Sequence, residues 1–236
     1  DITIPTGGTL TAGSSTITCA GDFTTSGGLI GKSAYDFNGA SSSGGNINCG
    51  SDSSIDDIFD GGGTVEAWIN ADSDGGGSNG RIFDKNRVLL SLSNEDSGKS
   101  KLLFYQYFDS DDGGWKSTNT VITNGKWHHV ALTYNNGATS NTPKMYVDGK
   151  EIPVTKTDTP TGTRNTDATS DLIIGNQAAV DKTFDGRIAK VAFWSHILTE
   201  AELRTGMFYN HAAMEADDTV FPDSVRVGGT GVIESD

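Results

Sequence analysis

The sequence predicts an all-β protein, a jelly-roll sandwich of two antiparallel sheets with one short C-terminal helix. Short runs in which apolar and polar residues alternate recur at intervals near ten residues. The segments between them are rich in Gly, Asn, Asp and Ser, and the 236-residue chain has 31 Gly but only 5 Pro. This punctuation is typical of tight turns between the strands of a sandwich.

Residues 1–32 differ in composition from the rest of the chain. They alternate apolar residues with Thr and Ser, as in "TLTAGSSTITCAGDF", but contain few large apolar side chains. The alternation predicts strands. We expect a β segment or docking linker that leans on another surface, such as a capsid, a fibre or a neighbouring protein. Its composition resembles the connecting regions of secreted adhesins and phage fibre proteins.

Residues 33–206 form the predicted sandwich domain. One hairpin is marked by Asp148-Gly149, because both positions of a type I′ turn need positive φ. The strands are expected within the following segments: 33–39, 44–50, 63–72, 80–85, 87–93, 101–109, 115–122, 126–136, 144–152, 171–177 and 184–194.

The predicted helix begins in "LTEAELRTGMF", residues 198–208. Thr199 is the expected N-cap and Glu202 follows three residues later, which is the pattern of a capping box. Residues 207–236 form a C-terminal extension. Within it, 209–218 are a possible continuation of the helix, and 223–233 are either a strand pair or a linker.

Charge narrows the possible partners. The formal net charge is -14, and 24 of the 31 acidic residues are Asp. This balance argues against nucleic acid, because phosphate contacts need Lys and Arg. The longest apolar runs, such as "VAFW" at 191–194, are too short to insert into a membrane. The chain begins at Asp1 and ends in "GGTGVIESD", so we expect a processed chain or a segment of a longer one.

The two cysteines, Cys19 and Cys49, lie in strand-like segments. They are either one disulfide or two buried thiols, since spacing alone does not define the geometry.

The order of motifs resembles the laminin-G-like, concanavalin-A-like lectin and glucanase family, in its pentraxin-related branch. The likeness runs from about residue 34 to 205 and is carried by "TVEAWINAD", "KWHHVALTYNN", "KMYVDGKEI" and "FDGRIAKVAFWSHILTEAEL". It implies a jelly roll that binds carbohydrate or protein ligands, often with Ca²⁺. Some relatives of the fold are glycoside hydrolases or polysaccharide lyases, so the fold alone does not define the activity.

The adjacent histidines in "WHHVALTY" invite a metal-site interpretation, which the strand geometry disfavours. Side chains alternate along a strand, so His128 and His129 point to opposite faces and cannot hold one metal ion together. We expect one of them to pack beside the hydrophobic layer with a hydrogen bond, and the other to lie near the opposite face.

Aromatic residues outside the expected core are candidates for carbohydrate binding. Trp68, Trp127 and Trp194 occupy motif positions of the core. Trp115 follows an acidic loop and a Gly pair, so it is the expected exposed stacking residue. Tyr105 and Tyr107 alternate with Phe residues and are expected on the solvent side of their sheet, as further binding residues or as simple packing.

Two acidic, Gly-containing loops are candidate Ca²⁺ sites, because Ca²⁺ prefers oxygen ligands. One loop carries Asp72 and Asp74, and the other carries Asp109, Asp111 and Asp112. Neither matches a complete EF-hand loop, and a flexible acidic loop is the alternative for each. The family's structural site uses an Asp in a "G-x-I-D" strand, where this chain has Ala189.

Three functions follow from these observations. The first is a non-catalytic, lectin-like carbohydrate-binding or adhesion module of an extracellular or virion-surface protein. The second is a structural decoration or fibre module of a phage particle. The third, a glycoside hydrolase or polysaccharide lyase, needs a carboxylate pair. The hydrolase branch carries E-x-D-x-x-E on one strand, and this sequence has no such string.

Overall fold

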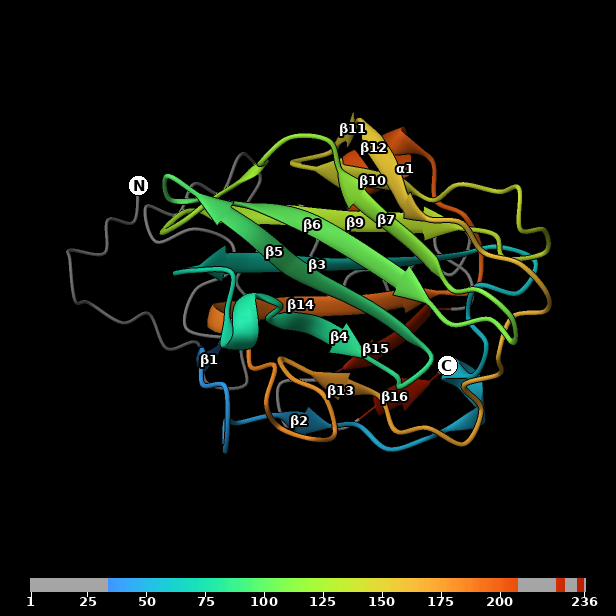
Figure 1. Ribbon diagram of the computed structural model, residues 1–236, viewed down its shortest axis with the longest axis horizontal. Coiled ribbons are helices and arrows are strands. Elements are labelled where there is room, and N and C mark those ends of the chain that lie inside the picture. Colours follow the sequence, from blue (N-terminus) through green and yellow to red (C-terminus); the bar gives the residue numbers. More distant parts are fainter. Residues whose placement is uncertain (1–33, 208–223, 228–232, 236) are drawn as a thin grey trace, which may run out of the picture.

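Two antiparallel sheets stacked face to face make up the described part of the protein, as the sequence predicts. The computed structural model describes residues 34–207, 224–227 and 233–235. Figure 1 views the sandwich with the strands of one sheet, β4 to β7, in front of β3, β9 and β14 of the other. The predicted N-terminal segment 1–32, with Cys19, lies outside the described residues, as does the predicted helix extension 209–218.

Sheet A has the strand order β11-β10-β9-β3-β14-β15-β16, with β1 also paired to β14. Its last two strands belong to the predicted C-terminal extension, so that part of the chain adds to the sheet and confirms the strand pair. The strands are β1 (Tyr35–Asn38), β3 (Gly63–Ala71), β9 (Trp127–Tyr134), β10 (Lys144–Val147), β11 (Lys150–Ile152), β14 (Asp185–Trp194), β15 (Ser224–Val227) and β16 (Ile233–Ser235).

Sheet B has the strand order β12-β7-β6-β5-β4-β13-β2, with β8 also paired to β6. The sequence expectation of one strand over 115–122 is wrong, because β7 and β8 share that segment, and β12 was not expected. The strands are β2 (Ile47–Asn48), β4 (Arg81–Asp84), β5 (Val88–Asp96), β6 (Lys99–Gln106), β7 (Gly113–Ser117), β8 (Ile122–Thr123), β12 (Val154–Asp158) and β13 (Ile173–Ile174).

Three short helical elements complete the fold. The 3₁₀ turns are η1 (Ser53–Ile55) and η2 (Gly76–Ser78), and the α-helix is α1 (Glu200–Gly206). The Thr199 hydroxyl accepts from the amide of Glu202, and the Glu202 carboxylate accepts from the amide of Thr199, so the predicted capping box is confirmed. Among the described residues, no helix is long and apolar enough to cross a membrane.

The main core lies between the sheets and follows from strand alternation. Along β6, Leu102 and Phe104 point into it, whereas Leu103 and Tyr105 are half-exposed on the other face. A smaller apolar cluster covers the outer face of sheet A beneath α1. Its members are Ala131, Tyr146, Ala192, Trp194, Leu198 and Leu203.

The adjacent histidines on β9 face opposite sides, as expected. His129 is buried on the α1 side, where its Nε2 lies 3.1 Å from Oε2 of Glu66, and Nε1 of Trp194 donates to the other Glu66 oxygen. His128 Nε2 accepts from the amide of Thr123, so its Nδ1 donates to Asp148 over 2.8 Å. Both histidines therefore have structural roles.

The Asp148-Gly149 turn is of the predicted type, with φ values of 52° and 70°. The Asp148 carboxylate also accepts a hydrogen bond from the backbone amide of His129 over 3.0 Å. Burial on its own raises the pKa of Asp148, but these hydrogen bonds from His128 and His129 outweigh it and lower the pKa below its ordinary value.

Trp115 lies in the main core, which corrects the expectation that it is exposed. Its side chain has 0% exposure and stacks on Phe104, with ring centroids 5.7 Å apart. The acidic loop and the Gly pair before Trp115 suggested exposure, but strand alternation decides which face it takes. Trp115 points to the same side of β7 as Gly113 and Ser117, which is the core side. Its neighbours Gly114 and Lys116 point to the outer face, which they share with Tyr105 and Leu103. A side chain without exposure cannot stack on a sugar.

We expect Trp115→Ala to lower the free energy of unfolding by about 3–5 kcal/mol, since it leaves a large cavity. Trp115→Phe should cost less, because its ring keeps the stack and removes an indole N–H that has no partner among the described residues. Denaturant unfolding measures both. Ile197→Ala, at a 48% exposed side chain, is the control and should have little effect. A Trp115→Ala protein as stable as the wild type contradicts the assignment.

The lowered pKa of Asp148 makes part of the stability depend on pH. A carboxyl group whose folded pKa lies below its unfolded value stabilises the fold above the unfolded pKa, near 3.8, and this contribution is lost as pH falls through the folded pKa. We therefore expect the stability difference between wild type and Asp148→Asn to shrink as the pH falls below 4. Urea unfolding from pH 7 to pH 2 measures it; a difference that stays constant down to pH 2 contradicts the prediction.

Candidate functional site

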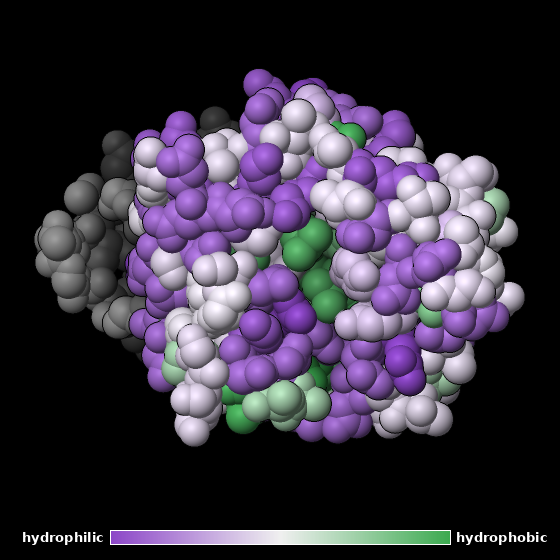
Figure 2. Space-filling view, in the orientation of Figure 1, coloured by the Kyte–Doolittle hydropathy of each residue, from purple (hydrophilic) through white to green (hydrophobic). Residues whose placement is uncertain are grey.

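A groove runs across the outer face of sheet B, and we call it the sheet B groove. It consists of two adjoining cavities of about 620 and 310 Å³, which share Arg81, Leu89 and Tyr107 as lining residues. Figure 2 shows hydrophobic residues in a central hollow that is bordered by hydrophilic residues, and a second hydrophobic patch at the lower edge of this face.

The strand register lines up the groove residues in a row across the sheet. Asp84 of β4 pairs with Leu89 of β5, and Leu89 pairs with Tyr105 of β6. On the far side of Asp84 the row continues through Ile173 to Asn48. Each residue in the row shares the outward face with its neighbours, so side chains far apart in sequence line one surface.

A β-bulge in β4 brings two charged residues to this face. Arg81 and Asp84 are three residues apart, and the register shifts between Arg81 and Phe83, so both charged side chains point outward while Phe83 stays in the core. Arg81 Nε donates to Asp84 over 3.0 Å, and its other nitrogens donate to Asn79 and Gln177. Burial outweighs the Arg81 and Asn86 contacts and raises the pKa of Asp84.

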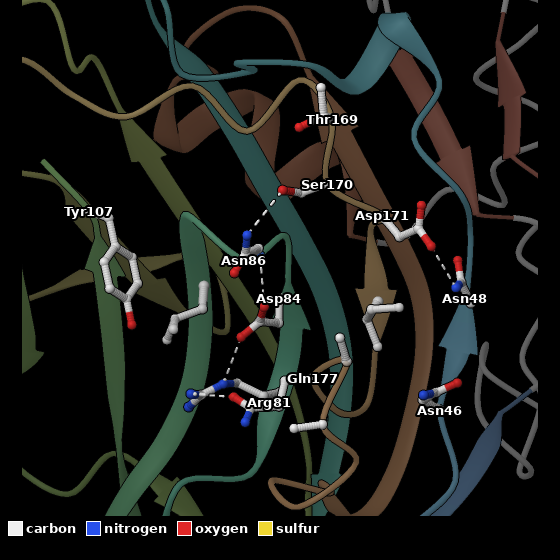
Figure 3. A pocket seen from close by; sticks show the side chains of 14 residues that line it. Asn46, Asn48, Arg81, Asp84, Asn86, Tyr107, Thr169, Ser170, Asp171 and Gln177 are labelled. Carbon is white, nitrogen blue, oxygen red and sulfur yellow. Dashed lines mark hydrogen bonds and ion pairs between the residues drawn. The ribbon is translucent and has the colours of Figure 1, made fainter. Parts of the chain in front are cut away.

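One wall of the larger cavity is the loop that leads to β13. Asn86 donates to the hydroxyl of Ser170 over 3.3 Å, and Asn48 donates to Asp171 over 2.8 Å. Figure 3 shows Arg81, Asp84 and Asn86 between Tyr107 on one side and the Asp171–Asn48 pair on the other.

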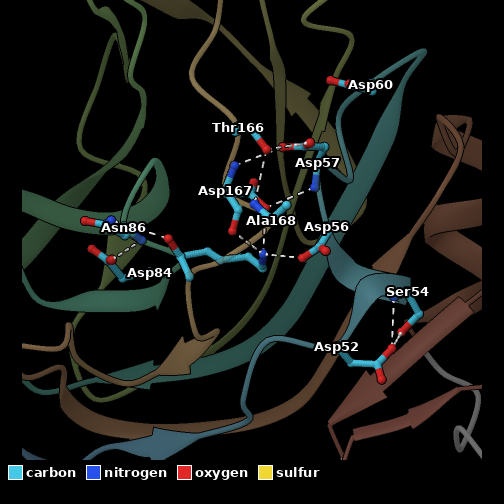
Figure 4. Close-up of polar contacts among 12 residues, drawn as sticks. Asp52, Ser54, Asp56, Asp57, Asp60, Asp84, Asn86, Thr166, Asp167 and Ala168 are labelled. Atoms are coloured by element: carbon cyan, nitrogen blue, oxygen red, sulfur yellow. Dashed lines mark hydrogen bonds and ion pairs between the residues drawn. The ribbon is translucent and has the colours of Figure 1, made fainter.

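A buried ammonium group holds this loop in place. Lys85 follows Asp84, but its side chain points away from the groove and is only 4% exposed. Its Nζ lies 2.6 Å from the carboxylate of Asp167 and 2.9 Å from that of Asp56, and it also donates to the Asp167 carbonyl (Figure 4). The lysine thus ties the loop before β13 to the η1 segment.

A second set of polar contacts supports the same junction. Asp57 accepts from the backbone amide of Asp167, from Thr166 and from Arg164, and Arg164 also pairs with Asp60. Burial opposes these contacts, but together they lower the pKa of Asp57. Burial instead raises the pKa of Asp167, with Lys85 only partly offsetting it.

The aromatic part of the groove comes from Tyr105 and Tyr107. Their ring centroids are 5.3 Å apart in an edge-to-face arrangement, and both are half-exposed on the outer face, as expected. Burial, together with the charges of Asp112 and Asp158, raises the pKa of Tyr105 to about 12, so its hydroxyl stays protonated at neutral pH. A part in carbohydrate binding stays a prediction for both.

Sequence reasoning missed the polar half of the groove. The residues concerned are Asn46, Asn48, Arg81, Asp84, Asn86, Asp171 and Gln177. They come from three separate parts of the chain. The strand register and the β4 bulge bring them together, and neither has a signature in the sequence. The glycines that lie next to several of these residues in the sequence were the one local sign that the residues stand at turns near the ends of strands.

The predicted Ca²⁺ loops use their carboxylates for hydrogen bonds within the protein. Asp109 accepts from the amide of Thr163, Asp111 from the hydroxyl of Thr161, and Asp112 from the amide of Phe108.

In the other predicted loop, Asp74 exchanges two hydrogen bonds with Glu95, and Asp72 is exposed. Among the described residues, no three His, Cys, Asp or Glu side chains lie close enough to hold a metal ion. The structure does not test Ca²⁺ binding at these loops, which stays a prediction.

Cys49 forms no disulfide within the described part of the chain, and it packs half-buried against the main core. Burial raises the pKa of its thiol to about 11.

We expect chelation by EDTA to leave the melting temperature unchanged, because backbone amides and a hydroxyl already donate to four of the five loop carboxylates, those of Asp74, Asp109, Asp111 and Asp112. Differential scanning calorimetry of protein purified in millimolar Ca²⁺, before and after chelation, measures this. A fall of several degrees would show that one of the loops does hold the ion, with Asp111→Asn and Asp74→Asn telling which.

Comparison with solved structures identifies the fold. The binding domain of Paraclostridial Mosquitocidal Protein 1 is 18% identical, with a TM-score of 0.52, over 72% of this chain and 42% of that one. The botulinum neurotoxin serotype G binding domain is 14% identical, with a TM-score of 0.50, over 73% and 41%. This chain thus spans about two fifths of each toxin structure.

A third similar structure is domain 4 of AbnA, a GH43 extracellular arabinanase from Geobacillus stearothermophilus, in complex with arabinotriose. It is 20% identical, with a TM-score of 0.49, over 75% of this chain and 77% of that one. No curated protein matches the chain. The family comparison matches residues 41–204 to the concanavalin A-like lectin/glucanases superfamily. With most of its length matched and two antiparallel sheets stacked as described, this chain belongs to that superfamily.

Proposed function

We propose that this protein is a non-catalytic, lectin-like module that binds carbohydrate in the sheet B groove. The observation that carries the proposal is the groove itself, in which an aromatic pair and an apolar floor stand beside converging amide, carboxylate and guanidinium groups. Its setting would be an extracellular protein or a virion surface, where a sugar-binding module promotes adhesion.

The chemistry of the lining suits a sugar. One face of a sugar ring is apolar enough to lie on an aromatic or aliphatic surface, and its hydroxyls both donate and accept hydrogen bonds. Leu89, Leu103 and the two Tyr rings offer such a surface. Asn46, Asn86 and Asp171 stand around it and offer both donors and acceptors.

The hydrogen bonds that the acidic side chains of the groove already accept support binding without cleavage. Glycoside hydrolysis needs one carboxylic acid that protonates the leaving group and a second carboxylate across the scissile bond. Asp84 accepts from Arg81 with one oxygen and from the amide of Asn86 with the other. Asp171 likewise accepts from Asn48. These acids serve to hold the groove in shape.

The first experiment is a glycan and polysaccharide array probed with the purified protein, with and without Ca²⁺. Binding in both conditions is expected, because the groove contains no predicted metal ligand. An array without any bound sugar would overturn the proposal.

We expect Tyr107→Ala to weaken binding to the best array ligand by at least about tenfold, which corresponds to 1.4 kcal/mol. Tyr107 lines both cavities, so its ring lies wherever a ligand enters the groove. Isothermal titration calorimetry measures the affinity. The matched control is Tyr35→Ala, because Tyr35 is 36% exposed on β1 of the other sheet. Equal losses in the two variants would move the site away from sheet B.

A further inference from the structure

The two cavities of the sheet B groove are arranged in series. The larger one lies over β2, β13 and β4, and the smaller one lies over β6, β7 and β12. They meet at Arg81, Leu89 and Tyr107. The seven strands from β2 to β12 are separated by six spacings of about 4.8 Å, so the row is roughly 29 Å wide. A single sugar ring fills only part of that width.

The cations of the groove are already paired with protein acceptors. Arg81 is 7% exposed and uses its nitrogens on Asp84, Asn79 and Gln177. Lys116 donates to the side-chain oxygen of Asn94 over 2.6 Å. A carboxylate or sulfate on a ligand would therefore have to displace a contact that already exists.

Of the three anions of the groove, two are exposed and lie near its ends. Asp171 lines the larger cavity and Asp158 the smaller one, with Asp84 between them. Three carboxylates against two cations leave the lining with a formal charge of -1, on a chain whose total is -14. An anionic sugar chain would meet like charges and no available cation.

The carboxylate oxygens favour a ligand that brings many donors. Asp171 accepts from Asn48 through one oxygen, and among the described residues no donor to its other oxygen is found. Tyr107 carries a hydroxyl beside the shared wall, and Asn46 an amide at the far side of the larger cavity. Sugar hydroxyls can donate to the Asp171 oxygen and can exchange hydrogen bonds with Tyr107 and Asn46, whereas a carboxylate or sulfate group has no hydrogen to donate to Asp171.

We infer that the ligand is a neutral oligosaccharide of several residues that lies across the strands and occupies both cavities at once. This inference rests on the proposed function and specifies its ligand class. The shared wall of Leu89 and Tyr107 would support the sugar residue that joins the two cavities. The charge of the lining disfavours acidic polysaccharides, such as polyuronates and sulfated glycans.

The test has two parts. Immobilised neutral polysaccharides (glucans, mannans, galactans, arabinans and xylans) and acidic ones (polygalacturonate, alginate and heparin) are first compared for binding. Fragments of one to six residues are then prepared from the neutral polymer that binds best and titrated calorimetrically. We expect the affinity to rise at least tenfold between one and four residues, and the acidic polymers to bind at least tenfold more weakly than the best neutral one.

Tyr105→Ala tests the use of both cavities, because Tyr105 lines only the smaller one. The variant should bind the shortest fragment recognised by wild type with nearly the wild-type affinity. The increase in affinity from short to long fragments should be at least threefold smaller for the variant than for wild type. Lys116→Ala tests the same cavity should the Tyr variant fold poorly, and Tyr35→Ala is the control.

The possible failures are distinguishable. An array with no neutral or acidic binder overturns the proposed function. Binding of a neutral sugar that is as tight for one residue as for six overturns only the use of both cavities. Preferred binding of an acidic polymer overturns the charge argument and leaves carbohydrate binding intact.

Discussion

The buried ammonium group of Lys85 is the interaction on which the groove depends. Removing one partner from a buried ion pair leaves an uncompensated charge and typically costs about 3–5 kcal/mol. Here one Nζ serves two carboxylates and a carbonyl, and those groups belong to two segments more than a hundred residues apart. The loop with Ser170 and Asp171 would have no other ionic anchor to β4 among the contacts described. The cation thus stabilises the fold and sets the shape of the cavity wall.

The rest of the groove is determined by the two-residue alternation of side chains along each strand. Residues that alternate along β5 and β6 supply core on one face and groove on the other, so one register determines both surfaces. The β4 bulge adds an exception that the site needs, since regular alternation would send Arg81 and Asp84 to opposite faces. A bulge of this kind re-aims side chains without lengthening the sheet.

Much of the fold could be predicted from the sequence, because alternation, turn residues and the capping box are local signals. The Asp148-Gly149 turn, the opposed histidines and the α1 cap are confirmed in detail. Strand β12 was missed because it is an edge strand whose pattern is almost wholly polar and exposed. Trp115 was misplaced because a loop with acids and glycines suggested exposure, while strand parity puts the ring inside. The polar groove residues depend on the register of β2, β13 and β4, which no local pattern encodes.

The two ends of sheet B have a consequence for assembly. At one end β2 is only two residues long, and at the other β12 carries a bulge between Lys156 and Asp158 with exposed polar side chains. Short, bulged or charged edges offer an incoming strand few groups with which to pair. Two copies of this domain brought side by side would therefore find few groups for strand pairing at the ends of sheet B. Under the proposed function, each copy would keep its own groove open, and weak contacts of several copies to one repetitive polymer would add up as avidity.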